Sequence, residues 1–235
     1  MVLRRRPGRS DHPAAHDGVK PRPHLLADEK LPPEPRQKRS LAARERWKAA
    51  GLALFGEKGY EATSVSDIAR RARLAVGGFY QHFTSKRQLL LVLMDDLLDK
   101  LSQLELRPSG SGGLRAGLHA LLAGAFSRDL KYLGAYRAWQ EASLSDPHLA
   151  RTQAQIQAWS TGRILLLFQA LHQHPAARPD VDLKGLARAL DAFFWNLLAQ
   201  AVHMPKPELN QWIDISTHLI FHALFLDSAA KPGEK

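Results

Sequence analysis

The feature that most constrains this chain is a pair of helix-start signals that lie close together behind a longer helical pattern. Ser64 and Asp67 form an S-x-x-D pair, in which the serine hydroxyl serves a first-turn amide and the acid favours the positive end of the helix. Ser85 and Gln88 form an S-x-x-Q pair of the same kind. Gly59 offers a left-handed position at which the preceding helix can end. We therefore expect a longer helix, then a short helix after Ser64 and a long helix after Ser85.

A turn near residues 73–75 is expected to divide the stretch between these two helix starts. A third short helix then runs to about Phe83, with Phe79 and Phe83 on its inward side. Two short helices joined by a tight turn, directly after a longer helix, are the pattern of a helix-turn-helix. The positions left on the outward side of the third helix are Val76, Gly77, Tyr80, Gln81 and His82.

These outward residues have the chemistry that the major groove of DNA requires. The groove admits one helix and presents donors, acceptors and methyl groups on the edges of the bases. Gln81 can pair with an adenine, and Val76 can contact a thymine methyl group. Gly77 permits a close approach of backbones, while Tyr80 and His82 can donate hydrogen bonds to phosphates.

Lys86 lies in the first turn of the long helix after Ser85, where free backbone amides already favour an anion. Together with Ser64 at the start of the second helix, it completes the set of candidate DNA contacts. Alternative interpretations stay open, because Tyr80 and His82 also suit half-buried packing positions and Lys86 also suits a solvated surface. A solvated face is equally typical of the charged residues of the second helix and its turn, Arg70, Arg71 and Arg73.

The positive charge of the chain is concentrated at its N-terminal end. The net charge is +10, and residues 1–40 hold 10 basic and 5 acidic residues. Residues 1–37 also contain half of the 14 prolines and few large apolar residues, so we expect a disordered basic arm over residues 1–38. Such an arm indicates a polyanionic partner, with nucleic acid ahead of an anionic membrane, or is simply a solvated tail.

Residues 44–91 resemble the DNA-binding domain of the tetracycline-repressor (TetR) family. The resemblance implies a homodimeric transcription regulator, usually a repressor, that binds a palindromic double-stranded DNA operator and is released by a small-molecule effector. The most specific part is the run from Phe79 to Lys86, in which an aromatic-x-x-aromatic pattern precedes Ser-Lys. The other matching residues are Ala50, Leu54, Phe55, Gly59, Tyr60, 62–65, 67–69, Leu89 and Leu90.

Three positions depart from the family pattern. Arg73 replaces the usual glycine of the turn, so the turn must strain or adopt another conformation. Ala75 replaces a serine or threonine that often caps the third helix, and Gly78 replaces a threonine or alanine that favours helix. The third helix is therefore expected to be loose until DNA orders it.

The rest of the chain is also patterned for helices, and nowhere does sustained strand-like alternation appear. The predicted fold class is all-α, with a helix-turn-helix domain over residues 39–86 and a helical domain for effector binding and dimerisation over residues 87–235. A flexible connector is expected over residues 108–113. The five helices predicted beyond it cover approximately residues 114–127, 129–145, 147–173, 183–204 and 207–227, of which the last two carry enough apolar residues to form a dimer interface.

Aromatic residues concentrate at helical spacing in this second domain. An aromatic-lined cavity there would suit a hydrophobic or aromatic effector. Each of these residues also suits an ordinary core or a dimer interface. The candidate pocket residues are Tyr136, Trp139, Trp159, Phe194 and Trp195.

Several classes of protein are disfavoured. The chain has no cysteine, no nucleophile elbow, no phosphate-binding loop and no set of metal ligands, so we expect neither an enzyme nor a cofactor. His218 and His222 share one helix face, but spacing supplies no third ligand. No apolar run approaches the roughly 18–20 residues that cross a bilayer, so we expect no membrane partner and a cytoplasmic, nucleoid-associated protein. A sequence-neutral architectural DNA binder remains the rival class.

Overall fold

Residues 20–33, 37–103, 113–129, 132–201 and 204–226 are described by a computed structural model, with side chains described for all of them except residues 125–129. These residues form nine helices and no strand apart from one isolated bridge between Ala177 and Phe225. The predicted all-α fold class is confirmed. The helices are α1 (Lys38–Lys58), α2 (Val65–Ala72), α3 (Val76–Phe79), α4 (Lys86–Ser102), α5 (Gly113–Asp129), α6 (Leu133–Ser145), α7 (Pro147–His172), α8 (Leu183–Gln200) and α9 (Lys206–Leu224).

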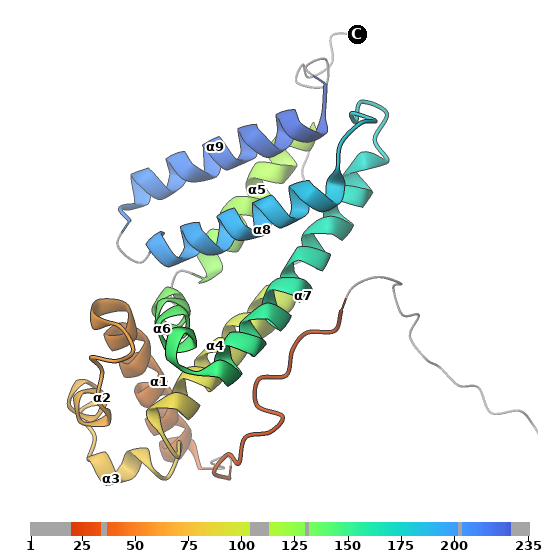
Figure 1. Cartoon of the computed structure of the whole chain (residues 1–235). Helices are drawn as coiled ribbons and strands as arrows, with labels where there is room; N and C mark the ends of the chain where they lie inside the picture. Colours follow the sequence, from red (N-terminus) through yellow and green to blue (C-terminus); the bar gives the residue numbers. More distant parts are fainter. Residues whose placement is uncertain (1–19, 34–36, 104–112, 130–131, 202–203, 227–235) are drawn as a thin grey trace, which may run out of the picture.

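The helices are arranged in two groups joined by α4 (Figure 1). Helices α1, α2 and α3 form one end of the molecule, and α5, α8 and α9 lie at the other end. Helix α6 packs against both α1 and α7, and α7 packs against α8. Helix α6, which belongs with α7 and α8, therefore brings the second group into direct contact with α1 of the first group. This contact adds to the covalent link through α4.

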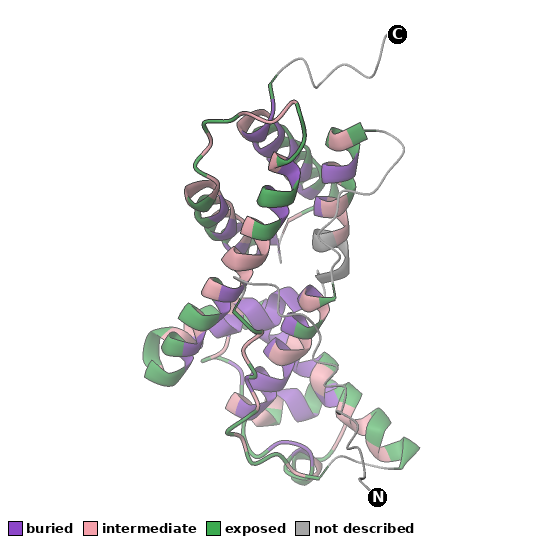
Figure 2. Ribbon diagram, turned by 90° about the vertical axis from the view of Figure 1, so that its right-hand side faces the viewer, coloured by how far each residue is buried: buried purple, intermediate pink, exposed green. Residues whose placement is uncertain are grey.

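Buried residues line the inner faces of both groups (Figure 2). Trp47, Phe55 and Phe79 close the core of the first group, while Tyr136 and Trp139 lie in the core of the second. Most helices keep one exposed face, as expected for helices at the surface of a folded domain. Among the described residues, no helix is both long enough and apolar enough to span a membrane.

The middle of helix α4 is apolar on all sides, and its packing explains why. Residues 89–94 are all buried, and the helix packs against α1, α5 and α6. Its start agrees with the predicted capping pair, because the Ser85 hydroxyl accepts a hydrogen bond from the Gln88 amide at 3.1 Å. The Gln88 side chain, however, accepts from the Thr84 amide at 2.8 Å and does not return to Ser85.

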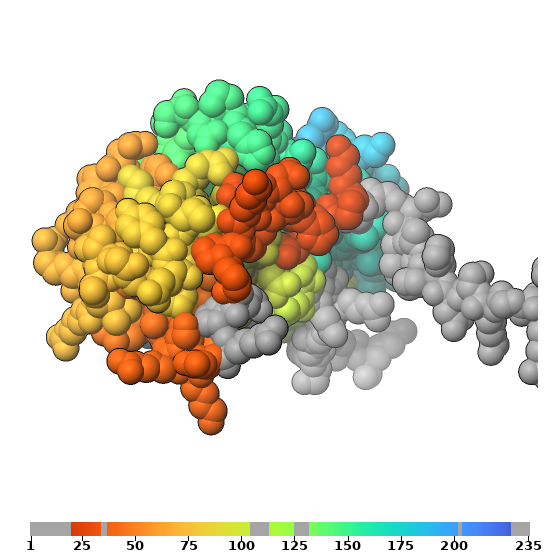
Figure 3. All heavy atoms as spheres, turned by 90° about the horizontal axis from the view of Figure 1, so that it is seen from below, coloured from red at the N-terminus to blue at the C-terminus, as the bar shows by residue number. Residues whose placement is uncertain are grey.

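Residues 20–33 correct the prediction of a wholly disordered arm. They lie along α4 (Figure 3), and Leu25 is buried in the core. The Arg22 guanidinium donates to both carboxylate oxygens of Asp95, at 2.8 and 3.2 Å. The Arg87 guanidinium donates to Glu29 at 2.7 Å. The composition argument failed here because a segment with little apolar surface is held by ion pairs to distant residues. Lys38, at the end of the predicted arm, begins α1, and residues 1–19 and 34–36 of the arm lie outside the described residues.

The later helices occupy nearly the predicted segments, with small shifts at their ends. Helix α6 begins at Leu133, later than the predicted start near residue 129. The junction of α6 and α7 is fixed by Asp146, whose carboxylate accepts from the His148 amide at 2.8 Å. Pro147 at the first position of α7 suits such a start, because its ring fixes a helical φ.

Candidate nucleic-acid interface

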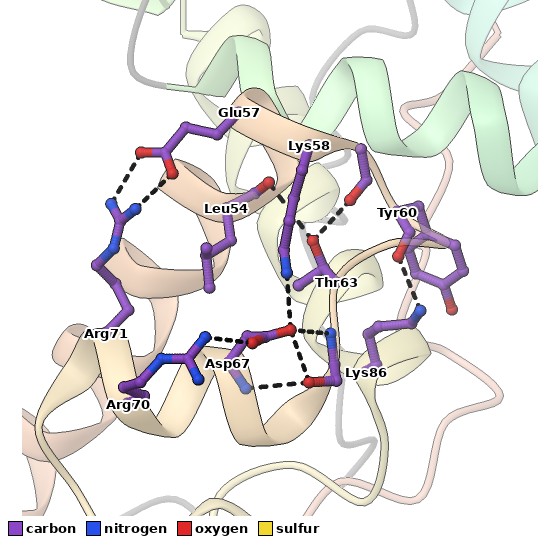
Figure 4. A network of polar contacts seen from close by, with 11 residues as sticks. Leu54, Glu57, Lys58, Tyr60, Thr63, Asp67, Arg70, Arg71 and Lys86 are labelled. Carbon is purple, nitrogen blue, oxygen red and sulfur yellow. Dashed lines mark hydrogen bonds and ion pairs between the residues drawn. The ribbon is translucent and has the colours of Figure 1, made fainter.

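The corner between α1 and α2 is fixed by backbone and side-chain hydrogen bonds (Figure 4). Helix α1 ends at Lys58 and is capped by Gly59, whose φ of 83° lies in the region that favours glycine. The buried Thr63 hydroxyl then donates to the Gly59 carbonyl at 2.6 Å. This hydrogen bond pulls the following residues back against α1, so α2 starts in a defined direction.

The predicted capping pair at the start of α2 is confirmed. The Asp67 amide donates to the Ser64 hydroxyl, and the Ser64 amide donates to the Asp67 carboxylate, both at 3.1 Å. The Lys58 ammonium lies 2.7 Å from the same carboxylate. Hydrogen bonds from Lys58 and Ser64 hold the pKa of Asp67 well below its usual value. Ser64 is exposed, but its hydroxyl is already hydrogen-bonded to Asp67 within the cap.

The turn between α2 and α3 is strained at the position where the family usually has glycine. Arg73 adopts a left-handed conformation with φ 54° and ψ 47°. A residue with a Cβ is disfavoured there by roughly 1–2 kcal/mol. The Arg46 side chain supports the turn by donating to the carbonyls of Ala72 and Arg73. Sequence reasoning missed Arg46. Its position in the pattern of α1 gives no sign that its side chain binds the turn after α2.

Replacing Arg73 with glycine is expected to raise the free energy of unfolding by about 0.5–1 kcal/mol. Glycine removes the left-handed penalty, and part of that gain is offset by a more flexible unfolded chain. Urea denaturation followed by circular dichroism measures the change. Arg73→Ala is the matched control, since it also removes the guanidinium but keeps the Cβ, and it should not gain stability. Equal gains in the two variants would show that backbone strain is not the cause.

Helix α3 is shorter than predicted and has a weak start. It covers Val76–Phe79 only, and Ala75 before it provides no side-chain cap. A Cβ at Gly77 would meet nothing within 4 Å, and one at Gly78 would make only ordinary contact with Trp47 at 3.8 Å. The two glycines are therefore not required by packing, and they loosen a helix that already lacks a cap.

The inward side of α3 is firmly anchored despite this weak start. The Phe79 ring is fully buried and meets the Trp47 ring edge-on, with ring centroids 5.5 Å apart. It also packs against Phe83 at a centroid distance of 5.5 Å. These contacts fix the C-terminal end of the helix relative to α1.

Four of the five predicted outward residues are exposed. Tyr80 exposes 55% of its surface and Val76 exposes 40%, and Gly77 and Gln81 are also exposed. The prediction for His82 is wrong, because this residue is only 5% exposed. Burial and the nearby Arg44 charge lower the pKa of His82, which favours a neutral ring. The periodicity failed because α3 ends at Phe79 and the chain turns back inward.

Lys86 lies at the first position of α4, next to the corner that ends α1. Its ammonium donates to the Tyr60 carbonyl at 2.8 Å and lies 4.1 Å from the centroid of the Tyr60 ring. Burial lowers the pKa of Lys86, and the charges of Glu61 and Glu141 oppose that shift. An ammonium with three donors that uses one on a carbonyl retains capacity for a phosphate.

The corner is also held from the second group of helices. The Glu141 carboxylate of α6 accepts from the amides of Tyr60 at 2.6 Å and Glu61 at 3.0 Å. Arg137 of the same helix donates to the Gly56 carbonyl at 2.8 Å. Sequence reasoning missed both residues, because their partners lie about 80 positions away in the chain.

A cavity of about 100 Å³ lies between α4, α5, α7, α8 and α9. Three of the five predicted pocket residues line it, namely Trp159, Phe194 and Trp195. Tyr136 lies behind this wall, with its ring centroid 4.7 Å from that of Trp195, and Trp139 is fully buried. The other lining residues are Leu101, Leu121, Leu122, Ser160, Arg163, Ile164, Leu167, Leu190, Asp191, Phe193 and Ser216.

One polar group in the cavity wall is a buried carboxylate. Asp191 accepts from the Thr161 hydroxyl at 2.9 Å and from the Trp195 ring nitrogen at 3.1 Å. Burial raises the pKa of Asp191, and hydrogen bonds from Ser160, Thr161 and Trp195 oppose that shift. The carboxylate therefore fixes the orientation of Trp195 in the wall.

The rings of the histidine pair on α9 lie close together. The ring centroids of His218 and His222 are 4.2 Å apart. Among the described residues, no group of three or more His, Cys, Asp or Glu side chains is placed to hold a metal ion.

Comparisons with known proteins match the geometry of the first group of helices. The family model "Bacterial regulatory proteins, tetR family" matches residues 49–93. The HTH-type regulator YuxN of Bacillus subtilis is 45% identical over 49 residues, which is 21% of this chain and 17% of YuxN. BetI of Escherichia coli is 27% identical over 168 residues, or 67% of this chain and 83% of BetI.

Solved structures extend the similarity to the whole fold. KstR2 of Mycobacterium tuberculosis, a ketosteroid transcriptional regulator, superposes with a TM-score of 0.60 at 17% identity, covering 84% of this chain and 100% of KstR2. SmeT in complex with triclosan gives a TM-score of 0.59 at 23% identity, covering 82% of this chain and 96% of SmeT. The match of the helix-turn-helix to the tetR-family model, together with a helical fold shared with solved regulators, supports a DNA-binding transcriptional regulator of the TetR family.

Proposed function

We propose that this regulator is a repressor that binds palindromic operator DNA as a homodimer and is released when a small molecule occupies its cavity. The observation that carries the proposal is the exposed surface of α3 and of the two residues that follow it. Val76, Gly77, Tyr80 and Gln81 face outward, while Phe79 is anchored in the core behind them. A helix held from behind and exposed in front is the arrangement that inserts into a major groove.

The DNA contacts divide into reading and positioning. Gln81 is the candidate for a bidentate contact to a base, and Val76 for a thymine methyl group. Tyr80 and Lys86 contact phosphates, which set the register of the helix without reading sequence. The basic residues of segment 1–19 add affinity that does not depend on sequence, because they supply charge to the polyanion.

Helices α8 and α9 are the candidates for the dimer interface. Leu219 exposes 58% of its surface on α9, and Ile215 exposes 40%. Two such helices from each subunit form a two-fold interface of four helices. We expect a dimer in sedimentation velocity at micromolar protein, and Leu219→Glu should shift it toward monomer. A wild-type protein that stays monomeric both with and without DNA would contradict this assignment.

The cavity favours an apolar effector. Its walls are mainly leucine and aromatic side chains, and its volume of about 100 Å³ is of the order of cavities that hold a benzene-sized molecule. SmeT, which shares the fold, has been solved with the small molecule triclosan. Small apolar and aromatic compounds should therefore change the fluorescence of Trp159 or Trp195 and lower the affinity for DNA.

Selection of bound fragments from a fragmented genome tests the proposed function. The recovered fragments should share an inverted repeat, since a two-fold dimer presents two recognition helices. Affinity for that repeat should exceed affinity for random duplex DNA by about 10³-fold or more at physiological salt. A ratio near one would favour an architectural DNA-binding protein over a regulator that reads an operator.

A further inference from the structure

We propose that Glu141 of α6 is a positioning residue that holds Lys86 in place for its phosphate contact. This inference rests on the proposed function, because it takes Lys86 as a ligand of DNA. It goes beyond that function by assigning the support of a DNA contact to a residue of the effector-binding half of the chain. The contacts that carry it run from Glu141 through Tyr60 to Lys86.

The first contact joins the Glu141 carboxylate to two successive backbone amides. The Tyr60 amide lies 2.6 Å from one carboxylate oxygen, and the Glu61 amide lies 3.0 Å from the other. Both amides follow the end of α1, where no intrahelical acceptor is available to them. The carboxylate gives each amide its own oxygen, and its negative charge strengthens both hydrogen bonds.

The second contact joins Tyr60 to Lys86. The Tyr60 carbonyl accepts from the Lys86 ammonium at 2.8 Å, and the ammonium lies over the Tyr60 ring at 4.1 Å. Tyr60 is therefore held by its amide on one side and holds Lys86 by its carbonyl and ring on the other. Movement of the Tyr60 peptide would move both groups that support the ammonium.

Helix α6 cannot release this corner by a small side-chain adjustment. Gly134 packs so closely on α1 that a Cβ there would overlap the Leu52 carbonyl oxygen, and Arg137 donates to the Gly56 carbonyl. The position of the Glu141 carboxylate at the corner between α1 and α2 therefore follows the position of the whole of α6. The Tyr136 ring of the same helix contacts Trp195 in the cavity wall, so a molecule that displaces Trp195 acts on the helix that supports Lys86.

Removing the charge of Glu141 distinguishes a positioning role from simple electrostatic repulsion of DNA by the carboxylate. A carboxylate near a phosphate contact repels DNA, so its neutralisation should strengthen binding. If Glu141 positions Lys86, the amide variant Glu141→Gln should instead weaken binding, because one of the two accepting oxygens becomes an NH2 group that cannot accept a hydrogen bond from a backbone amide. The two accounts predict changes of opposite sign.

The experiment is a double-mutant cycle on random-sequence duplex DNA, which needs no knowledge of the operator. Fluorescence anisotropy gives the affinity of wild type, Lys86→Ala, Glu141→Gln and the double variant over a series of salt concentrations. Lys86→Ala should lower the slope of log affinity against log salt by roughly 0.9 for each phosphate that the protein no longer neutralises. Glu141→Gln should lower the affinity several-fold with a similar reduction of slope, and should add little in the Lys86→Ala background.

Glu61→Gln is the matched control. It removes the same charge beside Lys86, but the Glu61 side chain is exposed and does not hold the two amides. Its salt slope should stay unchanged, and its affinity should stay unchanged or rise. Thermal unfolding and the hydrogen-exchange rate of the Tyr60 amide show whether each variant is folded and whether the corner has opened. Glu141→Asp keeps both carboxylate oxygens, so its salt slope should lie between those of Glu141→Gln and wild type.

The possible failures are distinguishable. An unchanged slope in Lys86→Ala would refute the phosphate role of Lys86 and with it that part of the proposed function. A reduced slope in Lys86→Ala but not in Glu141→Gln would leave the DNA contact intact and overturn the role of Glu141. Full additivity of the two substitutions would overturn it as well.

Discussion

Gly134→Ala should lower the free energy of unfolding by about 3 kcal/mol and weaken DNA binding. The added Cβ would overlap the Leu52 carbonyl oxygen and lie 2.8 Å from the Gly56 nitrogen. Both atoms belong to the backbone of α1, which cannot move aside as a flexible side chain can. Overpacking of this kind usually costs about 1–3 kcal/mol, and the backbone contacts put this position at the upper end of that range.

The weaker DNA binding follows from the same contact. Helix α6 must shift away from α1 to admit the methyl group, and Glu141 then moves away from the Tyr60 amide. Urea denaturation measures the stability, and anisotropy with duplex DNA measures the affinity. Stability and affinity should fall together, because one helix contact underlies both.

Gly77→Ala is the control for the Gly134 prediction. A Cβ at Gly77 meets nothing within 4 Å, so this variant adds a methyl group without a clash. Alanine favours helix over glycine by about 1 kcal/mol, and the free energy of unfolding should rise by up to that amount. If Gly134→Ala and Gly77→Ala change stability in the same direction, close packing of α6 on α1 is not what Gly134 provides.

The local signals in the sequence predicted the helix-turn-helix well. The Ser64 cap, the break at Gly59 and the strained turn at Arg73 each depend on residues close in the chain, where chemistry alone restricts the conformation. The same reasoning failed at His82. It extended the helical period beyond Phe79, whereas the uncapped, glycine-containing α3 ends there and turns the histidine inward.

Contacts between distant residues could not be predicted in this way. Arg22, Arg46 and Glu141 look like ordinary surface charges in the sequence, and each acquires its role from a partner that the fold brings near. The lining of the cavity could be predicted only in part, because it also depends on contacts between distant residues. Aromatic composition indicated Trp195 and Tyr136 equally, but only the packing of α6 behind α8 decides which of them lines the wall.

Gln81→Ala should lower the affinity for the best operator by about 1–3 kcal/mol, or roughly 5- to 150-fold, because the variant cannot make the bidentate hydrogen bonds to a base. Gln81 is exposed and lies just after α3. Its backbone amide donates to the Gly78 carbonyl at 3.3 Å, which leaves the side-chain amide available. The side chain is long enough to reach a base edge while Phe79 stays buried. The effect should nearly vanish on an operator variant that is changed at the contacted base pair.

A panel of single-base operator variants, measured with wild type, Gln81→Ala and Tyr80→Phe, locates that base pair. Tyr80→Phe is the comparison, because it removes only the hydroxyl proposed to contact a phosphate and should weaken all variants about equally. The looseness of α3 bears directly on the outcome, since the uncapped Ala75 start and Gly77 allow the helix to shift against the groove. If Gln81→Ala weakens every variant equally while Tyr80→Phe changes base preference, the reading and positioning roles of these two residues are reversed.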